Sequence, residues 1–181
     1  MSNARNLANL LGTSTTIPTD KLPTGGIVQI KHAESTAIST HTGGLGTYSD
    51  SNLTINFTPT SASNKLLINV SFLYGSNYSA GNHARLKKVV GATTSYIYFD
   101  DSTATNTRNV LGNIYAAFSV AQGFGTFSTV VEDSPATTSQ ITYTLQGEHQ
   151  HASGTLYING RNDGLDDCDR LGNITIMEIA G

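Results

Sequence analysis

Two histidines separated by one residue are the side chains of this sequence best suited to bind a metal ion. In the run Glu148-His149-Gln150-His151, alternation along a strand places His149 and His151 on one face, about 7 Å apart. Imidazole is a common ligand of transition metals, and three such pairs near a threefold axis can surround one ion. The alternative is a strand that ends in a loop, with both rings in water.

A second candidate for ion binding is the acidic loop of residues 162–169, Asn-Asp-Gly-Leu-Asp-Asp-Cys-Asp. Its carboxylates, among them Asp163 and Asp166, are oxygen ligands of the kind that Ca²⁺ takes. Their spacing does not match the twelve-residue calcium loop, which needs ligands at alternate positions and a terminal Glu. A solvated acidic loop paired with Arg161 or Arg170 is the alternative. We therefore expect no cofactor and keep a metal ion as the open alternative.

Aromatic rings and amide side chains in a loop indicate a surface that contacts sugars. Tyr78 lies in a run of Gly, Ser and Asn, where an exposed ring has no role in a core. Together with Asn82, Asp163 and Asp166 it forms the set of candidate receptor contacts. Other tyrosines lie in expected strands, where a ring packs in the core or against another subunit; these are Tyr74, Tyr96, Tyr98 and Tyr115.

No arrangement of residues typical of an enzyme occurs. The sequence has no Gly-x-Ser-x-Gly turn, no His-Glu-x-x-His pair and no phosphate-binding loop, so we expect a protein that is not an enzyme. The net charge of -3 gives no surface for nucleic acid, and no apolar run approaches a membrane span. The small basic group Arg85, Lys87 and Lys88 is expected to lie solvated on a strand. A single cysteine, Cys168, excludes an intrachain disulfide.

The elements that position these residues are strands, and residues 52–75 show the pattern most clearly. Leu53, Ile55 and Phe57 alternate with polar residues, a period of two that predicts a half-buried strand. A polar loop follows, and residues 66–74 then have one apolar and one mixed face, as expected near the middle of a sheet. We expect these two strands to form a hairpin.

Similar alternation recurs along the chain and predicts an all-β fold, an antiparallel β-sandwich or jelly roll. No helical crossover pattern separates the strands, so the sheets should be antiparallel. We expect hairpins between 84–90 and 95–99 and between 114–120 and 126–131. The last strand, 173–179, is apolar on both faces and should lie centrally or at a subunit contact. Further strands are expected at 27–31, 141–146 and 156–159.

Residues 1–25 are expected to lie outside this β domain, which spans residues 26–181. Residues 2–12 predict a short helix with one apolar stripe, and residues 13–26 carry two of the four prolines and predict an extended linker. A helix this short is marginal in water without tertiary contacts, so its stripe must dock. It either packs on its own domain or anchors the chain to copies of itself or to a partner. The anchor residues are Leu7, Leu10 and Leu11.

The strand patterns resemble those of a known family. The segments GGIVQIK at 25–31, LTINFTPTSASNKLLINVSF at 53–72, and TLYINGR followed by GNITIMEIAG at the end of the chain are similar to the C-terminal knob domain of bacteriophage tail fibres and virion appendage proteins, especially in cyanophages. ARNLANLLG at 4–12 resembles the helix that precedes such knobs. The resemblance implies a trimeric knob on a virion, with receptor contacts in the loops. The chain departs from long fibres in lacking a shaft.

The resemblance thus implies a non-enzymatic structural protein of a virion. It would be a short, homotrimeric phage fibre that attaches to another virion protein through residues 1–25 and meets the host surface with its knob. A surface glycan is the candidate receptor, and neither nucleic acid nor a membrane is an expected partner. Two alternatives remain: a capsid decoration protein without receptor binding, and a polysaccharide-cleaving appendage.

Overall fold

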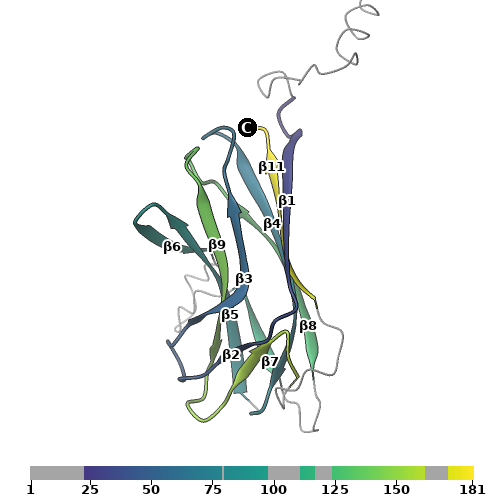
Figure 1. Ribbon diagram of the computed structural model, residues 1–181, viewed down its shortest axis with the longest axis vertical. Coiled ribbons are helices and arrows are strands. Elements are labelled where there is room, and N and C mark those ends of the chain that lie inside the picture. The colour runs from purple at the N-terminus through teal and green to yellow at the C-terminus, as the bar shows by residue number, and fades with distance from the viewer. Residues whose placement is uncertain (1–22, 79, 98–110, 117–123, 162–170) are drawn as a thin grey trace, which may run out of the picture.

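The computed structural model describes residues 23–78, 80–97, 111–116, 124–161 and 171–181, which are built from β-strands (Figure 1). The helix expected at 2–12 lies outside these ranges. The strands are β1 (Ile27–Ser35), β2 (Ser39–His41), β3 (Ser49–Phe57), β4 (Lys65–Ser76), β5 (Ala80–Val90), β6 (Thr93–Ile97), β7 (Gly112–Ala116), β8 (Gly125–Asp133), β9 (Ile141–His149), β10 (Leu156–Ile158) and β11 (Gly172–Ile179).

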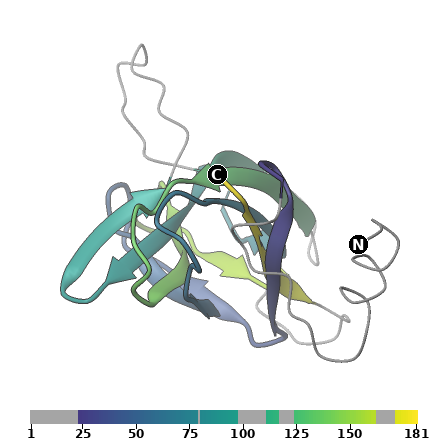
Figure 2. The ribbon, with the colours of Figure 1, turned by 90° about the horizontal axis from the view of Figure 1, so that it is seen from above.

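The strands form two antiparallel sheets that stack on each other (Figure 2). The first has the order β1-β11-β4-β10-β2, with β8 also on β4, and the second has the order β3-β9-β5-β6, with β7 also on β5. We set aside the short β2 and β10 and count β6 and β7, which both pair with β5, as one position. If the remaining positions are renumbered from 1 to 8 in chain order, the first sheet has the order 1-8-3-6 and the second has the order 2-7-4-5. This is the order of a jelly roll with two Greek keys, so the predicted antiparallel sandwich is confirmed.

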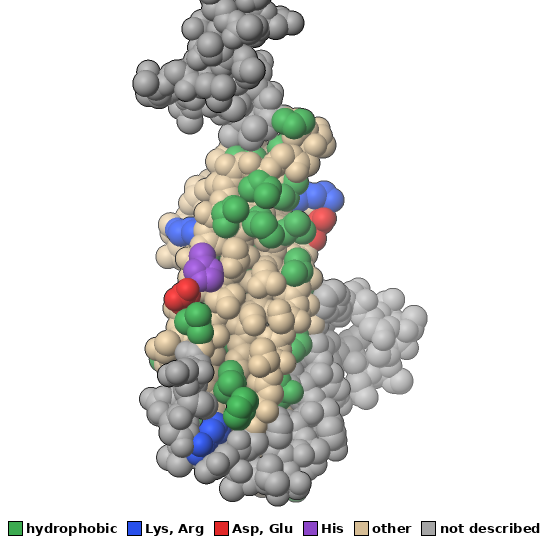
Figure 3. Space-filling model, turned by 90° about the vertical axis from the view of Figure 1, so that its right-hand side faces the viewer, with side chains coloured by type: hydrophobic (Ala, Val, Ile, Leu, Met, Phe, Trp, Pro, Cys, Tyr) green, Lys and Arg blue, Asp and Glu red, His purple; other side chains and the backbone are tan. Residues whose placement is uncertain are grey.

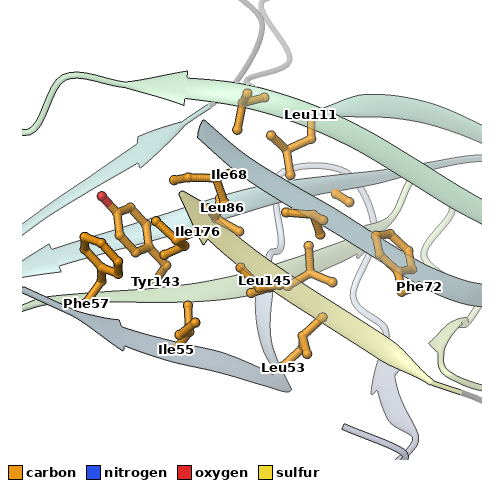
Figure 4. Packing of buried hydrophobic residues seen from close by; sticks show 14 of the residues in the cluster. Leu53, Ile55, Phe57, Ile68, Phe72, Leu86, Leu111, Tyr143, Leu145 and Ile176 are labelled. Carbon is orange, nitrogen blue, oxygen red and sulfur yellow. The ribbon is translucent and has the colours of Figure 1, made fainter. Parts of the chain in front are cut away.

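The core lies between the sheets and follows from the alternation of side chains along each strand (Figure 4). Leu53, Ile55 and Phe57 of β3 point inwards, whereas the residues between them are exposed. Phe72 of β4 packs on Phe127 of β8 with ring centroids 5.2 Å apart. Other buried side chains that meet between the sheets are Leu66, Ile68, Val70, Leu86, Ile141, Tyr143, Leu145, Ile174 and Ile176.

Two strand pairings expected from the sequence are wrong. β3 pairs with β9 in the second sheet, whereas β4 pairs with β8, β10 and β11 in the first, so β3 and β4 form no hairpin. In the same way β7 pairs with β5 in the second sheet and β8 pairs with β4 in the first, so β7 and β8 do not form the expected hairpin. Each connection carries the chain from one sheet to the other, which places the apolar faces opposite each other across the core. The hairpin of β5 and β6 is confirmed, with Gly91 at φ +56° in its turn, and β11 lies inside its sheet as expected.

The start of β1 and the end of β11 lie together at one end of the sandwich (Figure 1). The backbone N–H of Gly25 donates to the carbonyl of Ala180 at 2.9 Å, and the N–H of Ala180 donates to the carbonyl of Gly26 at 2.9 Å. The chain therefore enters the β domain beside its last described strand. We call this the Glu178 end, after the buried side chain that organises it.

Glu178 is a fully buried carboxylate that neutral groups hydrogen-bond from several sides. One oxygen accepts from the backbone N–H and the hydroxyl of Thr60 at 2.7 and 2.9 Å and from the amide of Asn64 at 2.7 Å. The other accepts from the amide of Gln29 at 2.6 Å. Burial alone would raise the pKa of Glu178, but these hydrogen bonds outweigh it and lower the pKa. An ionised side chain thus ties the connection after β3 to β1 and β11.

Candidate functional site

The opposite end of the sandwich is rich in buried polar side chains. It forms where β2 and β10 meet the ends of β4 and β9 and the start of β5. Buried polar groups in proteins are normally hydrogen-bonded, so their partners set the geometry of this end. We call it the histidine end and define it by the buried residues His41, Ser76, His83, Glu148 and His149.

Tyr78 and His151 form a stacked pair of rings at the outside of the histidine end. Their ring centroids lie 4.2 Å apart with an angle of 12° between the planes. Both residues are exposed, and Tyr78 keeps 43% of its surface in contact with solvent. The ring of His149 meets Tyr78 edge-on from below, at a centroid distance of 6.2 Å. This ring pair presents a flat aromatic surface to the outside.

The buried ring of His149 holds the ring pair in place. Its Nδ1 accepts a hydrogen bond from the backbone N–H of His151 at 2.9 Å, and its Nε2 lies 3.2 Å from the hydroxyl of Ser76. That hydroxyl donates to the carbonyl of Tyr78 at 3.0 Å. A Cβ on Gly154 would overlap the His149 ring, so only glycine leaves room for it. These contacts hold the ring pair in one arrangement.

His41 is buried between the sheets without full hydrogen bonding. Its Nδ1 lies 2.7 Å from the hydroxyl of Ser49, whereas its Nε2 has no hydrogen-bond partner among the described residues. The ring packs on the backbone of β9, where a Cβ on Gly147 would lie 2.8 Å from a ring carbon. Burial lowers the pKa of His41 to about 4, although the charge of Asp50 and the hydrogen bond to Ser49 act in the opposite direction. His41 is therefore neutral near pH 7.

His83 and Glu148 form a second buried pair. They are register partners on β5 and β9, with Nδ1 and Oε1 3.2 Å apart. A carboxylate that orients an imidazole is a component of general-base catalysis. Both side chains are at most 1% exposed, so no substrate reaches them in this structure. The pair acts as a polar link between two strands.

A further polar group lies on the outer face of the second sheet. The guanidinium of Arg85 is sandwiched between the rings of Tyr48 and Tyr96, with its central carbon 3.8 and 3.7 Å from the two centroids. Its Nε donates to the Gln146 side-chain oxygen at 2.7 Å. Cation–π contacts of this kind contribute roughly 0.5–1 kcal/mol each at exposed sites. Two of them and one hydrogen bond fix the orientation of the side chain.

Asp50 links this arginine to Lys87. One oxygen of Asp50 accepts from the amide of Gln146 at 2.6 Å, and the other accepts from the ammonium of Lys87. Burial alone would raise the pKa of Asp50, but these hydrogen bonds and the charges of Lys87 and Arg85 lower it. Asp50 therefore stays ionised and is neutralised by Lys87. We call Tyr48, Asp50, Arg85, Lys87, Tyr96 and Gln146 the arginine cluster.

This cluster is not evident from the sequence, because its members are brought together only by the register Asp50–Gln146–Arg85 across β3, β9 and β5. The one local signal is that Arg85 and Lys87 share a strand face. The expectation that the basic group is solvated is wrong. All three cations are half-buried, and Lys88 points to the inner side and pairs with Asp133 at 2.7 Å.

The structure separates the residues predicted to contact a receptor. Tyr78 has the expected exposed ring. Asn82 is fully buried in β5, so a direct contact would require its neighbours to move. Asp163 and Asp166 lie outside the described residues, as do the anchor residues Leu7, Leu10 and Leu11.

The two histidines predicted to bind a metal ion do not share a strand face. β9 ends at His149, which is buried, while His151 follows the strand and is exposed. Both ring nitrogens of His149 lie within hydrogen-bond distance of groups in its own chain. Within the described ranges, no three His, Cys, Asp or Glu residues are grouped so that they could hold an ion, and the site stays a prediction. In the same ranges no helix has the length and apolarity of a membrane span.

No protein-family model and no curated protein matches the sequence. Among solved structures, the chain is similar to infectious bursal disease virus of the Gx strain, with 11% identity over 85% of this chain and 37% of that one and a TM-score of 0.34. The VP2 subviral particle of that virus is 10% identical over 85% of this chain and 38% of that one, with a TM-score of 0.36. The Gt strain of the virus is 9% identical over 86% of this chain and 39% of that one, with a TM-score of 0.35. The chain thus spans less than two fifths of those chains. Similarity at this level carries no functional argument, so function is argued from the chain's own residues.

Proposed function

We propose that this chain is a non-enzymatic structural protein of a virion, a short homotrimeric fibre whose histidine end contacts the host surface. The observation that supports the proposal is that the start of the β domain and the exposed ring pair lie at opposite ends of the sandwich. The chain enters the knob at the Glu178 end, and the exposed ring pair lies at the other end. β4 runs between them, and its 12 residues span about 40 Å. An anchor in residues 1–25 would thus hold the ring pair away from the particle, as the resemblance to phage fibre knobs implies.

The outer face of the first sheet is suited to contact another copy of the chain. Ile30, Met177 and Leu67 are neighbours in register on β1, β11 and β4 and form an apolar row. Ile30 is 60% exposed, and Val130 on the neighbouring β8 is 51% exposed. Figure 3 shows hydrophobic side chains gathered on this face, among uncharged polar surface. Burial of such a row between subunits contributes about 25 cal/mol per Å² of apolar area.

The charges at the margins of this face favour a second copy as the occupant. His32 pairs with Glu34 and Lys65 pairs with Glu132, each at 2.8 Å. Because Lys65 and Glu132 are already paired within the chain and the row itself is uncharged, an identical face can pack on the row without burying either of these two charges unpaired. A strongly charged partner would find no complement here.

The mass of the full chain in solution tests the trimer. We expect three times the 19.1 kDa of one subunit by native mass spectrometry or light scattering. Ile30→Lys places a charge in the apolar row and should yield single subunits. Thr94→Lys, an equal change at an exposed position of β6, should leave the trimer intact. A wild-type mass of 19.1 kDa would exclude the trimer.

Removal of residues 1–22 tests the anchor. The knob should stay folded, because the hydrogen bonds of Gly25 and Gly26 with Ala180 remain. Incorporation into particles should be lost, as measured by electrophoresis of purified virions, and retained incorporation would refute the anchor. Binding of the knob to host glycans without released sugar supports attachment. Binding to none favours a decoration protein, and released oligosaccharide indicates an enzyme.

A further inference from the structure

The arginine cluster has the geometry of a preorganised anion site. Both faces of the Arg85 guanidinium are covered by tyrosine rings, and its Nε is taken by Gln146. The edge that carries the two terminal amino groups is left for a ligand, since no hydrogen bond or ion pair of Arg85 within the described residues uses it. We propose that this edge binds the carboxylate of an acidic sugar on a surface polysaccharide.

The charges of the cluster favour an anion. Two cations and one carboxylate lie together, and Lys87 is bound to Asp50. The cluster therefore carries one positive charge more than it carries negative charges. Two parallel N–H groups of a guanidinium match the two oxygens of a carboxylate, and this bidentate pair is among the stronger hydrogen-bonded contacts. The two tyrosine rings hold the guanidinium of Arg85 in one orientation, so little side-chain entropy is lost when a ligand binds.

The surroundings of the guanidinium favour a sugar over a small free anion. Tyr96 is 37% exposed and offers an aromatic surface beside the charged group. Exposed hydroxyl and amide side chains lie on the same sheet face, on both sides of β9 and β5: Thr54, Asn56 and Thr94. These groups suit the hydroxyls of a sugar. A single uncompensated cation on a chain of net charge -3 is too little for nucleic acid.

This inference goes beyond the contact proposed at the histidine end, because it places a sugar site on the outer face of the second sheet, and it rests on the proposed function only for the source of the sugar. Its test uses the isolated full chain, so the virion assignment and the sugar site can fail separately. Particle incorporation and subunit mass report on the first, whereas sugar affinity reports on the second.

Calorimetric titration with matched oligosaccharides tests the site. The probes are oligomers of galacturonate, glucuronate, mannuronate and guluronate, each compared with the same oligomer after its carboxylates are reduced to alcohols. We expect at least one acidic oligomer to bind about tenfold or more tightly than its reduced form, the effect of one charged hydrogen-bonded contact. Equal affinity within every pair, or no binding of any acidic oligomer, overturns the proposal. Tighter binding of a sulfated neutral oligosaccharide than of every uronate overturns the assignment to a carboxylate.

Variants locate the site on the second sheet. Arg85→Gln should lose the preference for the acidic oligomer. Arg85→Lys should weaken binding about tenfold, because it keeps the positive charge but not the two parallel N–H groups of the guanidinium. Lys65→Gln, which removes an exposed cation from the first sheet, is the matched control and should bind as the wild type does.

Thermal unfolding establishes that each variant is folded. If Arg85→Gln does not fold, the proposal is still tested by Arg85→Lys and by the comparison of acidic with reduced oligomers on the wild type. Unchanged affinity in a folded Arg85 variant overturns the proposal. An equal loss in Lys65→Gln also overturns it, because it shows that binding depends on general charge.

Discussion

Glu178 stands at the point where β1, β11 and the connection after β3 meet, and every group around its carboxylate is a donor. The two donors of Thr60 and the amide of Asn64 share one oxygen, and Gln29 reaches the other. A neutral amide in place of this carboxylate would turn an NH₂ group towards one of these donor sets. The site therefore selects an ionised carboxylate over a side chain of the same shape.

Glu178→Gln is expected to lower the free energy of unfolding by about 2–4 kcal/mol, because it leaves buried donors unsatisfied. Urea unfolding at pH 7 measures the loss. The matched control is Glu34→Gln, an exposed position, which should stay within about 0.5 kcal/mol of the wild type. Equal stability of the two variants would mean that the hydrogen bonds of Glu178 contribute nothing net.

Among the described elements, β4 pairs with three strands, β8 on one side and β11 and then β10 on the other. Asn159 lies at the junction between these two strands. Its backbone N–H donates to the carbonyl of Leu73 at 2.7 Å, and its side-chain amide donates to the carbonyl of Ser35 at 2.9 Å. Its φ of +56° is a left-handed conformation that asparagine tolerates better than most residues.

Asn159→Ala should destabilise the protein more than Asn159→Gly does. Both variants lose the hydrogen bond to Ser35, but alanine also meets the left-handed backbone with a Cβ, at a cost of about 1–2 kcal/mol. Chemical unfolding of the two variants measures the difference directly. A glycine variant no more stable than the alanine variant would show that the backbone conformation is not the limiting feature of the junction.

The strands themselves could be predicted from the sequence, but several of their partners could not. The alternation of Leu53, Ile55 and Phe57 identifies β3 wherever it pairs, because a strand with one buried face looks the same in either sheet. Sequence alone therefore predicts that strands adjacent in the chain, such as β3 and β4, pair with each other, whereas the jelly roll places them in different sheets. The arginine cluster depends on the same long-range register, since Arg85 and Gln146 are 61 residues apart. Tyr78, by contrast, was predicted as exposed from its loop composition alone.

Taken as a whole, the molecule has one end built on an ionised carboxylate and another built on a neutral histidine. Glu178 has a lowered pKa because its carboxylate is hydrogen-bonded, and His41 has a pKa lowered to about 4 because it is buried. In both cases the unfolded chain binds a proton more readily than the folded one. Acid therefore weakens both ends of the sandwich.

The free energy of unfolding should be highest near pH 7 and fall as the pH decreases from 6.5 towards 4. Protonation of His41 in the unfolded chain accounts for about 3 kcal/mol of this loss, and protonation of Glu178 adds to it below the usual carboxylate pKa of about 4.5. Urea unfolding at a series of pH values measures the slope.

His41→Gln should flatten the slope between pH 6.5 and 4.5, whatever its stability at pH 7. His32→Gln, the same change at an exposed histidine, should keep the wild-type slope. An unchanged slope in His41→Gln would show that another group carries the acid sensitivity.

The pairing of β1 with β11 along the register from Ile27 to Ser35 has a mechanical consequence. If the knob is tethered at Gly25 and gripped at Tyr78, the pull runs along these strands and not across them. All the hydrogen bonds of the pair then share the load at once, whereas a pull across the strands would break them one after another. Tension between the two ends is thus applied in shear, the direction in which such a ladder yields last.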